Sequence, residues 1–250
     1  MTDLPWPTLL ATALILFGAY TVYGLTGFGS TIVAMPLLAH LYPLRFAVPM
    51  MLVFDISAGL LLGWRNHRLV NWRELLRLLP WLLLGMGLGV TLLVQAPEAL
   101  LLLLLGAFVF AYAAYSLARR STPQPAGPVW ALPTGVVGGA FSALYGVGGV
   151  IYTTYLLRRL PDRNVLRASV GVLILGTALV RVALFTGSGL YEQPGLLALG
   201  FTMLPCALLG YLVGNRLHAS LPPQRVVQGV WWLLLAGGLS LLLRALTQPA

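Results

Sequence analysis

The sequence predicts an all-α, polytopic membrane protein, and its composition and its long apolar stretches carry that prediction. Of 250 residues, 59% are hydrophobic and 8% are charged, with a mean hydropathy of +0.89. Soluble domains carry about 25% charged residues. Six stretches approach or reach the ~20 apolar residues that a helix needs to cross a bilayer. These stretches are residues 46–63, 75–94, 99–117, 165–185, 194–213 and 226–246.

The charge pattern fits the same class. The net charge of +9 comes from fifteen arginines without any lysine, and most lie in short connections between apolar stretches. That placement is typical of topology determinants rather than of a nucleic-acid-binding face. The single Cys206 excludes an intrachain disulfide, and the three histidines lack partners at ligand spacing, so neither a metal site nor a cofactor is expected. The N-terminus lacks a basic region and is interpreted as a retained first membrane segment.

Two alignments of the chain with itself predict an internal duplication. Residues 79–98 realign with residues 204–223 at an offset of 125, with glycines and prolines in register. LTGFG at 25–29 matches LYGVG at 144–148 at an offset of 119. We therefore expect one repeat at 1–118, a linker at 119–133 rich in Pro, Ser and Thr, and a second repeat at 134–250. Each repeat would contain one glycine-broken segment followed by three of the apolar spans.

Arginine placement predicts that the broken segments are re-entrant. The arginines between 65 and 77 put the connection after span 46–63 in the cytoplasm. A second cluster, between 158 and 167, follows the second broken segment. If that segment crossed the membrane, this cluster would lie outside; if the segment enters and returns, the cluster stays inside. Each repeat then crosses three times, which inverts the second repeat relative to the first.

The two broken segments are the candidate binding sites. The first covers residues 8–41 with its break at 24–30, and the second covers 130–160 with its break at 144–149. A helix that restarts after a glycine break offers unpaired N–H groups and the positive end of its dipole to an anion. The alternative is that these glycines only permit close helix packing. The candidate substrate-binding residues are Gly27, Phe28, Gly29, Ser30, Thr31, Tyr145, Gly146, Gly148 and Gly149.

Asp55 and Arg181 are the two ionisable residues well inside predicted spans. An unpaired charge at that depth is costly, so pairing or a functional role is the default expectation. Three interpretations remain open from the sequence. Arg181 binds the substrate anion while Asp55 carries a proton; the two form a structural salt bridge; or Arg181 extends to the outer interface.

Three segments resemble the sulfite exporter TauE/SafE family of bacterial membrane transporters. They are YGLTGFGSTIVAMPLL at 23–38, GLLLGWRNHRLVNW at 59–72 and LPWLLLGMGLG at 79–89, echoed by GGAFSALYGVGGVIYTTYLL at 138–157. The resemblance covers nearly the whole chain but rests on diffuse glycine motifs. It implies transport of sulfite, thiosulfate, sulfonates or related organic anions. The second motif has GVGGVIY where the first has GFGSTIV. A two-fold symmetric site would therefore carry different side chains in its two halves.

The expected function is therefore secondary transport of a small sulfur-containing oxyanion by alternating access, coupled to protons or to the membrane potential. Two alternatives remain: a cation or metal exporter that uses Asp55, and a non-catalytic membrane scaffold. No Ser–His or carboxylate pair indicates an enzyme. The expected location is the bacterial inner membrane with multiple passes. The expected partners are the substrate anion and the bilayer, with no nucleic acid, and a homo-oligomer is left open.

Overall fold

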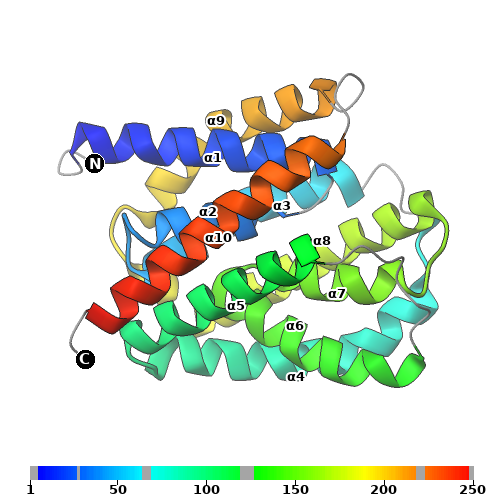
Figure 1. The fold of residues 1–250 in the computed structure, drawn as a ribbon. Helices are drawn as coiled ribbons and strands as arrows, with labels where there is room; N and C mark the ends of the chain where they lie inside the picture. Colours follow the sequence, from blue (N-terminus) through cyan, green and yellow to red (C-terminus); the bar gives the residue numbers. More distant parts are fainter. Residues whose placement is uncertain (1–4, 27–28, 64–68, 119–126, 218–222, 248–250) are drawn as a thin grey trace. The chain divides into compact units, whose positions relative to one another are not determined.

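The computed structural model describes residues 5–26, 29–63, 69–118, 127–217 and 223–247. The described chain is helical, without strands, as the composition predicts. The helices divide into two compact units that are discontinuous in sequence. Unit 1 comprises Met1–Met50, Ala96–Ser121 and Gln193–Ala250, and unit 2 comprises Met51–Gln95 and Thr122–Glu192. Figure 1 shows the helices of each unit coloured along the chain.

Six of the described helices are long and apolar enough to cross a membrane. They are α1 (Trp6–Thr26), α4 (Trp72–Gln95), α5 (Glu98–Ala118), α8 (Arg163–Gly187), α9 (Leu196–Leu217) and α10 (Pro223–Thr247). The last five correspond to predicted spans. The remaining predicted span, 46–63, forms α3 (Leu44–Gly63), which is not among the six. Helix α1 is longer than the predicted half-helix 8–23, because Gly24 continues the helix instead of ending it.

In unit 1, α1 lies along α9, and α5 lies along α10 (Figure 1). Glycines on α9 make the first contact close: a Cβ on Gly210 or Gly214 would collide with the backbone of α1. Gly106 and Gly238 have the same role between α5 and α10. Small residues of this kind let membrane helices approach within van der Waals contact of their backbones.

In unit 2, α4 packs along α6 (Ala131–Tyr145), and α8 contacts both α4 and α7 (Gly148–Leu157). A buried apolar cluster joins the beginnings of α4, α6 and α8 to the end of α7. Its members include Leu75, Ala131, Leu156 and Leu166. The short helix η2 (Pro128–Trp130) precedes α6, and η3 (Leu190–Glu192) follows α8.

Each break is a turn between two helices. In unit 1, α1 gives way to α2 (Ser30–Leu38) through Gly29, whose φ of 91° is in the left-handed region. In unit 2, α6 ends at Gly146, with a φ of 73°, and α7 begins two residues later. Glycine reaches this region without the steric cost that a Cβ imposes. The left-handed glycines that separate the described helices thus lie at Gly29 and Gly146, within the ranges 24–30 and 144–149.

Candidate functional site

The buried ion pair of unit 2 is the most polar feature inside a predicted span. Arg181 on α8 donates from Nη2 to Oδ2 of Asp55 on α3 at 2.7 Å. Arg181 is 2% exposed and Asp55 is 5% exposed. The pairing is thus present, and the guanidinium does not extend to the outer surface.

Arg181 has more hydrogen-bond donors than Asp55 occupies. Its Nε and Nη1 are buried and have no acceptor among the residues that the structure describes. A guanidinium carries five N–H donors in a rigid planar fork. Leaving such donors unsatisfied in a buried position costs free energy. Arg181 therefore keeps two buried nitrogens without an acceptor in the part of the chain that the structure describes.

Two tyrosines and a threonine lie around this pair. Tyr152 on α7 is buried, and its hydroxyl hydrogen bonds with that of Thr177, one helical turn before Arg181. Arg181 and Asp55 act electrostatically on Tyr152 and on Tyr191 of η3. Burial raises the pKa of Tyr191 to about 12, against the opposing effect of Arg181, so its phenol remains a protonated donor.

The second break adjoins this group through Tyr152. A Cβ built on Gly149 would meet the Tyr152 hydroxyl at 3.4 Å, so the phenol lies over the first turn of α7. The first N–H groups of any helix lack acceptors within that helix. The structure therefore brings Gly149, Tyr152, Arg181 and Asp55 into one neighbourhood.

The other candidate residues of the second break make backbone and packing contacts with neighbouring residues. Gly146 adopts the left-handed conformation and donates its N–H to the Ser142 carbonyl at 2.9 Å. Gly148 contacts the backbone of Gly138, and a Cβ there would collide with the Gly138 oxygen. The Tyr145 ring is buried and packs on Phe141 at 5.7 Å between centroids. These contacts explain the residue types without a ligand, so the packing interpretation applies to Gly148 in particular.

The first break is described within unit 1 alone. Ser30 and Thr31 begin α2 and are buried, and Gly29 provides the turn before them. Predicted site residues Gly27 and Phe28 lie outside the described residues. Two buried tyrosines precede the break on α1, and the ring of Tyr23 contacts that of Tyr211 on α9. Buried aromatic rings therefore precede this break on α1, and buried hydroxyl groups follow it on α2.

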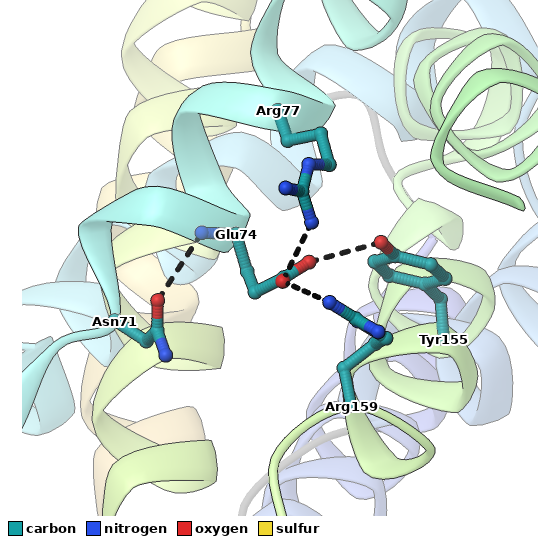
Figure 2. Close-up of polar contacts among 5 residues, drawn as sticks. All are labelled: Asn71, Glu74, Arg77, Tyr155 and Arg159. Carbon is teal, nitrogen blue, oxygen red and sulfur yellow. Dashed lines mark hydrogen bonds and ion pairs between the residues drawn. The ribbon is translucent and has the colours of Figure 1, made fainter. Parts of the chain in front are cut away.

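A second polar cluster in unit 2 is absent from the sequence prediction. Glu74, in the first turn of α4, is 5% exposed. Its Oε1 accepts from Arg77 Nη1 at 2.9 Å and from Arg159 Nη2 at 2.6 Å, and its Oε2 accepts from the Tyr155 hydroxyl at 3.0 Å (Figure 2). The backbone N–H of Glu74 donates to Asn71 Oδ1 at 3.2 Å. The signal in the sequence is that Glu74 is the one acid between Asp55 and Glu98, in an arginine-rich stretch.

Within the residues that the structure describes, no three His, Cys, Asp or Glu side chains are grouped to hold an ion. The described groups around Arg181 are N–H and O–H donors together with the Asp55 carboxylate.

The chain is 29% identical over 194 residues to the "Probable inner membrane transporter protein TsaS" of Comamonas testosteroni, covering 77% of this chain and 81% of that protein. No solved structure matches. The protein is a multi-pass membrane transporter of the inner membrane. Because the model for the family described as "Sulfite exporter TauE/SafE" matches residues 12–241, the chain belongs to that family.

Proposed function

We propose that this transporter moves a small sulfur-containing oxyanion, such as sulfite, thiosulfate or a sulfonate, and that Arg181 binds it. The observation that carries the proposal is the buried Arg181 guanidinium, whose Nε and Nη1 have no acceptor among the described residues. The family's description as sulfite exporters supports the choice of a sulfur oxyanion.

The chemistry of the guanidinium suits this ligand. Its planar fork of N–H donors matches two oxygens of an oxyanion, and charge-assisted hydrogen bonds are roughly twice as strong as neutral ones. Asp55 neutralises Arg181 when no anion is bound, which avoids an isolated buried charge. A bound monoanion, such as a sulfonate or hydrogen sulfite, would give the pair a net charge of −1, so protonation of Asp55 would restore neutrality. This gives Asp55 the role of proton carrier in coupled transport.

Re-entrant hairpins are part of the proposal, and contacts inside each unit support them. In unit 2, the beginning of α6 and the end of α7 share one apolar cluster, so the chain returns to the level at which it started. In unit 1, the Tyr42 hydroxyl, after α2, lies 2.9 Å from the Thr12 hydroxyl, early in α1. Broken helices of this kind supply binding sites in many secondary transporters.

Duplication is supported by matching backbone contacts. On α4, Gly85 and Gly89 approach the carbonyls of Val136 and Ala140, and on α9, Gly210 and Gly214 approach those of Phe17 and Thr21. The α9 glycines follow those on α4 by 125 positions, and their partners on α6 follow those on α1 by 119. These are the two offsets found by aligning the sequence with itself. In both units, a broken segment packs against a span from the other proposed repeat.

Topology has a direct test. Single cysteines at positions 121 and 162, introduced after Cys206 is replaced by serine, are expected to react with a membrane-impermeant thiol reagent from the same side. Reaction from opposite sides would refute the re-entrant second segment and the inverted arrangement with it.

Asp55 favours an anion over a cation as the substrate. Its Oδ2 is bound by Arg181, and a cation would have to displace a positive group already in place. The cation-exporter alternative therefore requires the pair to separate before binding.

The test of the proposed function is flux in proteoliposomes. Wild-type protein is expected to accelerate uptake of labelled sulfite, and Arg181→Gln to reduce it at least about a hundredfold, because two charge-assisted hydrogen bonds of ~1.5–3 kcal/mol each are lost. Arg216→Gln, which removes an exposed arginine in the last turn of α9, is the control and should retain flux. Flux of divalent cations without flux of sulfite, thiosulfate or methanesulfonate would overturn the proposal.

A further inference from the structure

We propose that Glu74, Arg77, Tyr155 and Arg159 form a second anion site, where α4 begins, in which the Glu74 carboxylate occupies the position that a transported anion takes in passing. We call these four residues the Glu74 site. The inference rests on the proposed anion transport and adds a second binding step to it.

The donor geometry around Glu74 is that of an oxyanion site. Two guanidinium groups and one phenol direct hydrogen bonds of 2.6–3.0 Å at a single carboxylate (Figure 2). A sulfite or sulfonate would likewise present negatively charged oxygens to these donors. Glu74 is therefore a tethered anion held by groups that would also hold a free one.

Positive charges outnumber negative ones where α4 and α8 begin and α7 ends, so another anion would be attracted there. Five arginines with described side chains lie there, at the beginnings of α4 and α8 and after α7: Arg73, Arg77, Arg158, Arg159 and Arg167. Besides Glu74, the nearby acid is Asp162, whose Oδ1 already accepts the N–H groups of Asn164 and Val165. The Nε of Arg158 is buried and has no acceptor among the described residues. The surplus of positive charge attracts anions and raises their local concentration.

Helix α7 connects the Glu74 site to the Arg181 pair. Tyr152 hydrogen bonds with Thr177, one turn before Arg181 on α8, and the Tyr155 hydroxyl donates to Glu74. The two tyrosines are three residues apart, which places them on one face of the helix and about 4.5 Å apart along its axis. Helix α7 therefore carries on one face both the tyrosine of the Glu74 site and the tyrosine nearer the Arg181 pair.

A purely structural role for the network makes a different prediction. In that case Glu74 fixes the beginning of α4 to the end of α7, and its loss destabilises the protein whatever anion is present. In our proposal, Glu74→Gln leaves Arg77 and Arg159 without their anion, and a free oxyanion takes its place. The Asn71 cap on the Glu74 N–H does not use the carboxylate, so the variant keeps the start of α4.

The experiment measures thermal unfolding of the purified full-length protein in detergent, with sulfite or methanesulfonate titrated at constant ionic strength against chloride. Arg181→Gln serves as the parent, because it removes the first site. Adding Glu74→Gln is expected to tighten the apparent affinity for the oxyanion at least about tenfold, since the competing carboxylate is gone. Adding Arg159→Gln as well should abolish this binding. Glu192→Gln, which removes an exposed acid outside the cluster, is the matched control and should not change it.

The outcomes separate this inference from the proposed function. If wild type binds sulfite through Arg181 but Arg181→Gln/Glu74→Gln does not, the Glu74 site is wrong and the proposed function stands. If no variant and no wild-type protein responds to an oxyanion, and liposomes show no flux, both are wrong. Should Glu74→Gln fail to fold, Arg159→Gln is used alone: it should slow flux while leaving equilibrium binding at Arg181 unchanged. Unchanged flux in that variant would also overturn the inference.

Discussion

The glycine breaks of the two units share a backbone design but differ in the chemistry around them. Each break contains a glycine in the left-handed region, Gly29 in unit 1 and Gly146 in unit 2, and each follows a helix that packs on a glycine-bearing partner. In unit 2 the following helix adjoins a buried ion pair through Tyr152. In unit 1 the corresponding helix begins with the hydroxyl groups of Ser30 and Thr31. Both units therefore share the glycine break and its helix packing, whereas the charged residues that we assign to binding lie in unit 2.

The largest expected effect concerns the charge pair of unit 2. Arg181→Gln should lower the free energy of unfolding by ~3–5 kcal/mol, because Asp55 is left as a buried, uncompensated charge. The neutral pair Asp55→Asn/Arg181→Gln should recover most of that loss. Thermal unfolding in detergent measures both. A double variant as unstable as the single one would show that the charges themselves hold unit 2 together.

The next effect tests whether the two scaffolds are equivalent. Gly85→Ala in unit 2 and Gly210→Ala in unit 1 should each cost ~1–3 kcal/mol, because both place a Cβ against a backbone carbonyl. Gly87→Ala, on α4 with no atom within 4 Å of its Cβ, is the control and should be neutral or slightly stabilising. A large cost at one of the two positions alone would break the equivalence of the units.

The smallest effect concerns the break of unit 1. Ser30→Ala removes one buried hydroxyl, worth ~0.5–1.5 kcal/mol if it bonds to the anion, so sulfite flux should fall about two- to tenfold. Initial rates in proteoliposomes over a range of sulfite concentrations measure the change. A loss as large as that of Arg181→Gln would move the main binding residue from unit 2 to unit 1.

Much of the fold was predictable from local composition. Five of the six predicted spans coincide with long apolar helices, since the spacing of apolar residues and the bilayer thickness determine them. The helix ends at the first break were less accurate. Gly24 lies within α1 and contacts the backbone of α9. A single sequence does not show whether a glycine ends a helix or permits a close approach between two helices.

The members of the candidate site that the sequence makes conspicuous are those whose charge lies within an apolar span. Asp55 and Arg181 are conspicuous for that reason, and the structure pairs them. Glu74 lies among interfacial arginines, where charges are expected, and its partner Arg159 is 85 positions away. The position of Tyr152 between the break and the pair also depends on helix packing that no local pattern encodes.

The most direct test of the central claim is sulfite flux through the neutral-pair variant Asp55→Asn/Arg181→Gln. This variant removes the charges that we assign to binding while avoiding an unpaired buried charge. With folding confirmed by its unfolding temperature, our account predicts at least about a hundredfold slower flux than wild type. Flux within about twofold of wild type would contradict it, because the pair would then be structural and the anion would bind elsewhere.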